Sequence, residues 1–249
     1  RARRLLDDAA VRSGVEAFGL RMALSRQLSN LGPVGMLLRD QPTLRDSIDV
    51  LIRHHAAMNG ALAMMLDEQG ELVLIREELI AQPTEPVRQS IELAVGVLFA
   101  MMRQLLGPLW QPRRVCFTHA APRDMSTHLQ FFGRTVEFGH DFNGIACLAR
   151  ELNAPNPGAD PQMARYAQRL LDATPNATTS PEAAAIDDVR RTILLLLPGG
   201  RCGIEQVSAH LGLACRTVQR RLAERDLSFS GLVNELRVQL AQRHILQGS

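Results

Sequence analysis

The 249-residue sequence contains no lysine, no C-x-x-C pair and no apolar run long enough to cross a membrane. Its longest apolar run, Leu93 to Met102, stops at Arg103, whereas a membrane-spanning helix needs about 20 apolar residues. No signal peptide opens the chain, so we expect a cytoplasmic protein without a membrane partner. Every basic side chain other than histidine is therefore an arginine. The arginine guanidinium makes bidentate contacts to phosphate and guanine.

Motifs that carry catalytic or metal chemistry are also missing. Without C-x-x-C pairs, a zinc ribbon or a redox motif is excluded, and free thiols in a reducing compartment are expected. The cysteines are Cys116, Cys147, Cys202 and Cys215. G-x-S-x-G, G-x-G-x-x-G and phosphate-loop sequences do not occur, so we expect no enzyme and no cofactor. His119, His128 and His140 form no H-x-x-x-H or H-E-x-x-H pair, so no metal site is expected. The adjacent acids Glu77 and Glu78 are expected to diverge into solvent.

The composition is that of a folded globular chain, with 46% hydrophobic and 22% charged residues. Its length suits one large domain, or one medium domain and one small domain. The net charge is only +2, but residues 186–249 contain nine arginines and six acids, which leaves +3 there and −1 in the remainder. The positive excess therefore lies at the carboxyl end.

Hydrophobic periodicity predicts an α+β domain, a small antiparallel sheet with packed helices, followed by an all-α domain. Helices are predicted over 1–28 with breaks at Gly14 and Gly19, after an N-cap at Thr43, and over 86–106, 123–132 and 162–171. Strands are predicted at 62–66, 71–76, 115–118, 135–138 and 145–149. The polar segment 174–182, with two prolines, is expected to be a linker between residues 1–173 and 183–249.

After this linker, short apolar faces joined by a Gly212 turn are typical of a helix-turn-helix. In the second helix, expected at 215–225, Cys215, Val218 and Leu222 would turn inward, since they recur at helical spacing. Arg216, Gln219 and Arg220 would then project together toward bases in the DNA major groove. Thr217, Arg221 and Arg225 lie beside them and suit contacts to phosphate.

Residues 211–222 (LGLACRTVQRRL), followed by Ser228-Phe229 and a helix with Arg237, resemble the first helix-turn-helix of AraC-family transcription regulators. The family pattern is Leu-Gly-x-Ser-x-Arg-Thr-Leu-x-Arg-x-Leu. Ala214 stands where the family usually has a serine N-cap, and Asp226 where a glycine turn is common. The family has a second helix-turn-helix, so for a chain that ends at Ser249 we expect a truncated DNA-binding region with weak operator affinity.

Upstream fragments resemble the arabinose-binding-like domain of the ornithine-utilisation and virulence-regulator type. They are Phe18-Gly19-Leu20, Gly32 with Gly35, Pro42-Thr43-Leu44, Pro122 to Gly133, and Val136 to Asn143. The resemblance implies a bacterial regulator whose residues 1–173 bind an unidentified small-molecule effector and form a homodimer. It also implies double-stranded operator DNA and RNA polymerase as partners.

The same residues are also compatible with an α+β enzyme or metal-binding protein, with His119, His128 and His140 as ligands and the helical part as a protein-interaction appendage. Separately, the apolar helix at 87–106 either fills the core or lines an effector pocket, with Phe99, Met101 and Met102 as candidates.

Overall fold

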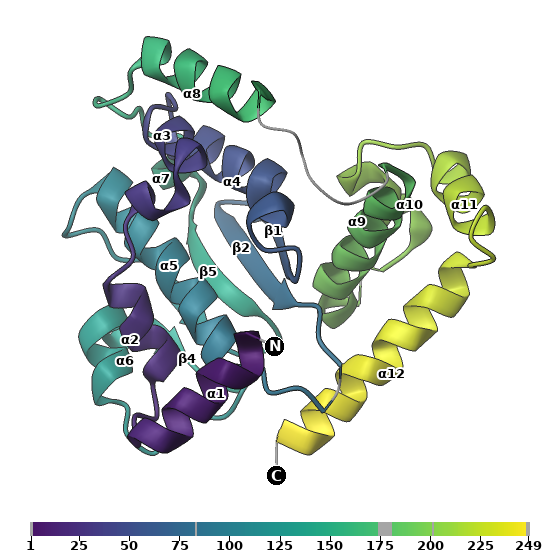
Figure 1. The fold of residues 1–249 in the computed structure, drawn as a ribbon, viewed down its shortest axis with the longest axis horizontal. Helices are drawn as coiled ribbons and strands as arrows, with labels where there is room; N and C mark the ends of the chain where they lie inside the picture. Colours follow the sequence, from purple (N-terminus) through teal and green to yellow (C-terminus); the bar gives the residue numbers. More distant parts are fainter. Residues whose placement is uncertain (1, 83, 174–180, 201, 248–249) are drawn as a thin grey trace.

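The computed structural model describes residues 2–82, 84–173, 181–200 and 202–247, and it contains a five-stranded sheet followed by a helical carboxyl-terminal region (Figure 1). The strands are β1 (Leu62–Gln69), β2 (Leu72–Leu79), β3 (Arg114–Cys116), β4 (Val136–Glu137) and β5 (Asn143–Leu148). Their order across the sheet is β1-β2-β5-β3-β4. Neighbours are antiparallel except β3 and β4, which are parallel. The predicted α+β class is therefore confirmed, and the sheet is mixed.

Strands β1 and β2 form a hairpin that is buried on both faces. The pairing runs from Leu62 opposite Leu79 to Gln69 opposite Leu72, and Gly70 closes the turn at φ +66°, a conformation that glycine adopts without a steric penalty. Both strands extend beyond their predicted ends. Seven of the eight residues of β2 are buried, so this strand is covered on both faces.

Alternate residues of β1 belong to two different hydrophobic cores. Met64 and Leu79 lie in the large core of the amino-terminal part, whereas Ala63 and Met65 lie in the core of the carboxyl-terminal helices. Successive side chains of a strand point to opposite faces of the sheet. The hairpin is therefore the layer that separates the two cores.

The amino-terminal helices cover one face and the ends of the sheet. They are α1 (Ala2–Ser13), α2 (Phe18–Leu24), α3 (Pro33–Arg39), α4 (Leu44–Met58), α5 (Arg88–Leu106), α6 (Ser126–Phe132), α7 (Ala149–Leu152) and α8 (Pro161–Ala173). Short 3-10 turns lie at Leu28–Leu31, Gly133–Thr135 and Leu197–Gly199. Thr43 caps α4 as predicted, since its side chain accepts a hydrogen bond from the Asp46 backbone nitrogen.

Helix α5 is the central helix of the large core. Phe99 and Met102 are fully buried in it, and Phe99 packs its ring against Phe131 and Phe132. Within the described residues, α5 is also the one helix long and apolar enough to match a membrane span by composition, and 56% of that stretch is buried inside the protein. Core helices of folded domains meet the same criterion.

The predicted helix break at Gly19 is wrong, because Gly19 lies inside α2. Its role is close packing: α2 crosses α5 so tightly that a Cβ on Gly19 would lie 1.9 Å from the carbonyl oxygen of Gln89. The Gly19 amide also donates a 2.8 Å hydrogen bond to the Gln89 side chain. A glycine therefore marks a helix contact here, and the chain turns before it, at Gly14 with φ +66°.

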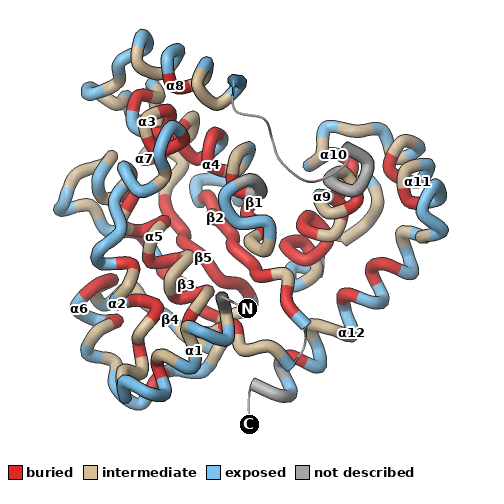
Figure 2. The backbone as a smooth tube through the Cα atoms, in the orientation of Figure 1, coloured by how far each residue is buried: buried red, intermediate tan, exposed pale blue. Residues whose placement is uncertain are grey.

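The carboxyl-terminal region consists of four helices around a second core. They are α9 (Pro181–Leu196), α10 (Ile204–His210), α11 (Cys215–Ala223) and α12 (Phe229–Gln247). Helix α9 is buried around most of its circumference, since Leu194 and Leu195 are buried as well as Val189 and Ile193. Figure 2 shows why: α9 lies between the β1–β2 hairpin and the remaining helices, so it is covered on almost every side. Of the predicted linker 174–182, residues 174–180 lie outside the described residues, and α9 begins at Pro181.

We expect Gly19→Ala to lower the free energy of unfolding by about 2 kcal/mol or more, because the new methyl group meets rigid backbone and overpacking typically costs 1–3 kcal/mol. Thermal and urea denaturation measure the change. Gly158→Ala is the matched control, since the atom nearest to its Cβ is the Asn156 side chain at 3.5 Å. Equal stability of the two variants would contradict the close α2–α5 contact.

Candidate nucleic-acid interface and its contact with the sheet

Helices α10 and α11 form the predicted helix-turn-helix. Gly212 turns the chain at φ +62°, and the Leu213 amide donates a 2.9 Å hydrogen bond to the Ser208 carbonyl. Only glycine takes this left-handed conformation without strain. The turn therefore sets the angle at which α11 leaves α10.

The inward face of α11 holds the helix on the second core. Val218 and Leu222 are 0% and 1% exposed, and they pack with Val207 of α10 and Val189 of α9. Cys215 is half-buried at the start of the same face. The predicted anchoring of α11 is confirmed.

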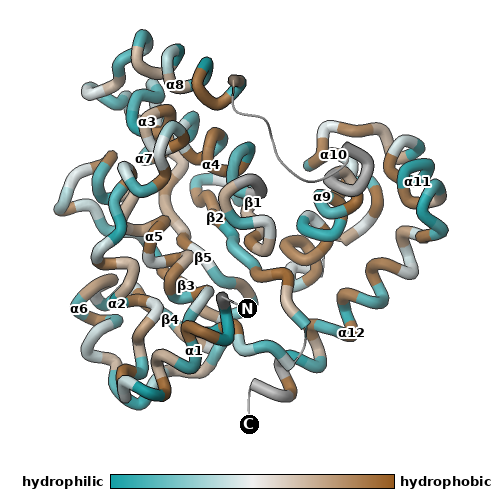
Figure 3. The backbone as a smooth tube through the Cα atoms, viewed as in Figure 1, coloured by the Kyte–Doolittle hydropathy of each residue, from teal (hydrophilic) through white to brown (hydrophobic). Residues whose placement is uncertain are grey.

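The outward face of α11 carries the predicted base-contacting side chains. Arg216, Gln219 and Arg220 are exposed together, and Thr217 and Arg221 are half-buried beside them. The helix contains three arginines and no acid. The only acid near this face in the described ion pairs is Glu224, 3.9 Å from the Arg220 guanidinium, and both side chains are more than half exposed. Figure 3 shows the hydrophilic character of α11 at the outer edge of the molecule.

Arg225 lies outside α11, because the helix ends at Ala223 rather than at residue 225 as predicted. The chain then turns through Asp226 at φ +56°, and the Leu227 amide donates to the Leu222 carbonyl at 3.0 Å. This left-handed residue ends the helix in the way a glycine commonly does. Exposed Arg225 remains adjacent to the carboxyl end of the outward face.

The amino-terminal end of α11 has no side-chain cap. Ala214 occupies the N-cap position with extended backbone (φ −71°, ψ 144°), and its methyl group accepts no hydrogen bond. The alanine that stands in place of the family's usual serine therefore leaves the start of α11 without a side-chain cap. The first turn of α11 depends on backbone carbonyls and on the anchoring of Val218.

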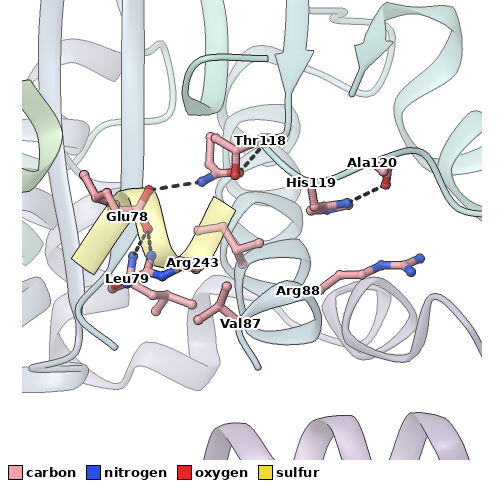
Figure 4. Close-up of a pocket in the computed structure, with 11 residues that line it drawn as sticks. Glu78, Leu79, Val87, Arg88, Thr118, His119, Ala120 and Arg243 are labelled. Carbon is pink, nitrogen blue, oxygen red and sulfur yellow. Dashed lines mark hydrogen bonds and ion pairs between the residues drawn. The ribbon is translucent and has the colours of Figure 1, made fainter. Parts of the chain in front are cut away.

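Helix α12 runs from α11 back to the sheet, where its end makes a buried ion pair (Figure 1). Arg243 donates to Glu78 of β2 at 2.8 Å, and also to the carbonyl oxygens of Leu79 and Ala81 at 3.3 and 3.0 Å. Glu78 further accepts from Asn143 at 3.3 Å. Figure 4 shows Arg243 reaching from α12 to Glu78 at the edge of a small pocket of about 60 Å³. Glu78 and Arg243 are 9% and 6% exposed.

The expectation that Glu77 and Glu78 are solvated is wrong, since both are buried. The two side chains do point in opposite directions as predicted. Both directions lead into the protein interior, because β2 is covered on both faces. The sequence did contain a signal for Arg243: Leu236 and Leu240 place it on the apolar stripe of α12, seven residues after Leu236. A charged residue on such a stripe indicates a buried partner.

The histidines proposed as metal ligands do not come together as a set. Nε2 of His119 and of His128 lie 3.4 and 3.2 Å from one carboxylate oxygen of Glu92, a buried acid within the apolar helix α5. Burial lowers the pKa of His119. His140 lies elsewhere, 2.5 Å from Asp141. The metal-ligand interpretation of these three histidines is not supported, and Glu92 was missed because attention falls on the apolar run that begins directly after it, at Leu93.

One other group has metal-binding composition: ligand atoms of Cys116, Glu137 and His140 lie within 4.8 Å of one another. Burial raises the pKa of the Cys116 thiol to about 12, and Glu137 is paired with Arg114 at 3.6 Å. Metals bind the thiolate form of cysteine. This environment therefore disfavours ligation by Cys116.

An anchored helix-turn-helix with a basic outward face, joined to an α+β domain, defines a DNA-binding transcription regulator. A family model described as the arabinose-binding domain of AraC transcription regulators matches residues 1–156. The chain therefore belongs to the AraC family of transcription regulators. These regulators bind DNA and small-molecule effectors, and they are not enzymes.

Relatives with known names support the same class. The chain is 29% identical to the HTH-type transcriptional regulator VirS of two Mycobacterium tuberculosis strains, CDC 1551 and H37Rv, over 98% of this chain and 72% of VirS. Its fold is similar to the crystal structure of the transcriptional regulator CdpR from Pseudomonas aeruginosa, with a TM-score of 0.53 and 18% identity, over 90% of this chain and 73% of CdpR.

We expect Ala214→Ser to raise the free energy of unfolding by about 1 kcal/mol, since a serine oxygen at the N-cap accepts a hydrogen bond from a free amide of the first turn. Thermal denaturation measures this gain. Ala223→Ser, at the exposed carboxyl end of the same helix, is the control and should bring no gain. The uncapped start would be disproved if both serines had the same effect.

The Glu78–Arg243 ion pair makes a second prediction. Arg243→Met should lower the free energy of unfolding by roughly 3–5 kcal/mol, because it leaves a buried carboxylate unpaired. Adding Glu78→Gln should recover part of this loss, since the amide buries no charge. Urea denaturation of the two single variants and the double variant tests the coupling. Arg237→Met, exposed on the same helix, is the matched control; additive losses at 78 and 243 would refute a direct pair.

Proposed function

We propose that the chain is an effector-controlled, sequence-specific regulator of transcription in the bacterial cytoplasm. Residues 183–249 bind double-stranded operator DNA, residues 1–173 bind the effector and form a homodimer, and residues 174–182 link the two. Paired subunits match paired DNA half-sites, and RNA polymerase is the partner through which transcription responds. The family membership and the helix-turn-helix support this proposal.

In this proposal α11 lies in the major groove with Arg216, Gln219 and Arg220 toward the base edges. Arginine recognises guanine and glutamine recognises adenine through paired hydrogen bonds. Thr217, Arg221 and Arg225 contact phosphate, which fixes the register of the helix without selecting sequence. The observation that carries the proposal is the joint exposure of residues 216, 219 and 220 above the buried Val218 and Leu222.

Control by the effector uses the contacts between the sheet and the carboxyl-terminal helices. Ala63 and Met65 of β1 share the core of α9, and Glu78 of β2 holds Arg243 of α12. A ligand changes DNA binding only as far as it binds one arrangement of the two parts better than another. The hairpin is the element through which such a preference reaches α9 and α12.

We expect Arg220→Ala to weaken binding to the preferred DNA sequence by roughly 1–3 kcal/mol, about ten- to a hundredfold, and to relax base preference. The preferred sequence is first selected with this chain from a pool of random duplexes. Affinity for the selected and for a scrambled duplex is then measured by fluorescence anisotropy over a range of salt concentrations.

Two further variants separate base contact from charge. Arg221→Ala should weaken both duplexes alike and reduce the salt dependence by about one ion. Arg165→Ala, exposed on α8, should change neither. If Arg220→Ala kept full affinity and full sequence preference, the placement of α11 in the groove would be wrong.

A further inference from the structure

A large cavity lies on the face of the hairpin opposite to α9 and α12. Its volume is about 500 Å³, it is open to solvent on one side, and it is lined by β1, β2 and helices α1, α4 and α5. Most of its wall is apolar, including Leu51 of α4, Met64 of β1, and Leu93, Val97 and Met101 of α5. Ligand sites are typically concave, mostly apolar spaces of 300–1,000 Å³ with a few polar groups. Helix α5 therefore serves both as core and as a pocket wall.

Three polar side chains project from different elements into this apolar wall: His55 from α4, Glu77 from β2 and Ser90 from α5. Each has a buried atom for which the described part of the chain supplies no hydrogen-bond partner, namely His55 Nε2, Glu77 Oε2 and Ser90 Oγ. Glu77 is only 3% exposed. Buried polar atoms are nearly always paired, so three unpaired ones around one cavity indicate a ligand that pairs with them.

The protonation of these groups defines what they can bind. His55 Nδ1 lies 2.5 Å from the Ile52 carbonyl, which can only accept, so Nδ1 holds the proton and Nε2 presents a lone pair. Burial lowers the pKa of His55, so the ring stays neutral. Burial raises the pKa of Glu77 to about 8, so at pH 7 this carboxyl group is mainly protonated and donates a hydrogen bond. The cavity therefore offers one strong acceptor and one strong donor.

Among the described residues that line the cavity, none offers a charged ligand a free counter-charge. Arg3 is the one arginine among them, and it already donates to the Ile80 carbonyl at 2.6 Å and pairs with Glu85 at 3.1 Å. A ligand carboxylate would face a protonated acid and a neutral imidazole. A sugar would bring a hydroxyl group on nearly every carbon, more than His55, Glu77, Ser90 and the more exposed Asn59 of this wall can satisfy, and unpaired buried hydroxyls are costly.

We propose that this cavity is the effector site, and that it takes a neutral, mostly apolar molecule with a hydroxyl group held between His55 and Glu77. A hydroxyl group matches the two side chains, because it donates to His55 Nε2 while it accepts from Glu77. The regulatory part of this inference rests on the proposed function, whereas the binding part rests on the cavity alone.

The position of the cavity explains how occupancy reaches the DNA-binding helices. Glu77 faces the cavity, and its neighbour Glu78 faces the opposite side and holds Arg243 of α12. Leu79 lines the cavity with its side chain, and its carbonyl oxygen accepts a hydrogen bond from the same Arg243. A ligand that moves this end of β2 therefore acts directly on the end of α12.

The test uses one hydrocarbon chain with different head groups. Binding of 1-decanol, decanoate, decylammonium and arabinose to the 249-residue chain is measured by isothermal titration calorimetry at pH 7. We expect saturable binding of 1-decanol, at least tenfold weaker binding of both ions, and no binding of arabinose. No 1-decanol binding up to its solubility limit, equal binding of the three decyl compounds, or tighter binding of arabinose would each overturn the proposal.

Variants place the probe in the cavity. Ala94→Phe puts a ring into the cavity from α5 and should abolish 1-decanol binding, and Glu77→Leu should weaken it at least tenfold. Glu71→Leu, at the exposed end of the same hairpin, is the matched control and should bind normally. Circular dichroism shows that each variant is folded. Unchanged binding in Ala94→Phe would overturn the site.

DNA affinity measured in the same samples separates the two proposals. If 1-decanol binds in the cavity and shifts the affinity for the selected duplex, both stand. If it binds with the expected preferences but leaves DNA affinity unchanged, the ligand site stands and its role as effector site is overturned. Loss of sequence preference in Arg220→Ala is independent of either result.

Discussion

The rest of the structure depends on one constraint: the β1–β2 hairpin is buried on both faces. The alternate side chains of β1 belong to two cores, one below α4 and α5 and one below α9. Since neighbouring residues in a strand cannot move independently, any displacement of the hairpin is felt in both cores. The hairpin therefore couples the amino-terminal part to the carboxyl-terminal helices, because it packs against both.

The buried acids of β2 show what this arrangement requires. Glu78 is stabilised inside the protein because Arg243 and Asn143 supply hydrogen bonds, so charge and burial coexist there. No cation among the described residues pairs with Glu77, one residue away, and burial raises its pKa instead. Two identical side chains thus differ in chemistry because the faces of one strand differ in environment. One acid suits structural coupling and the other suits ligand recognition.

The DNA-facing helix depends on the same division between inward and outward residues. Val218 and Leu222 hold α11 on the core, which leaves its arginines exposed without competing acids inside the helix. Both ends of α11 lack the usual terminal residues, with Ala214 at the start and left-handed Asp226 after the end. Its position therefore relies on packing more than on local capping.

Helical and strand periodicities are local properties of the chain, so the α+β class, the helix-turn-helix and the outward set on α11 could be predicted from the residues alone. The turn at Gly212, where a positive φ is needed, could be predicted in the same way. The environment of Glu77, the partners of Glu78, Glu92 and Arg243, and the packing role of Gly19 became visible only in the folded molecule. The contacts of Gly19 and Arg243 join segments 70 and 165 residues apart in the chain, and periodicity contains no information about such distant contacts.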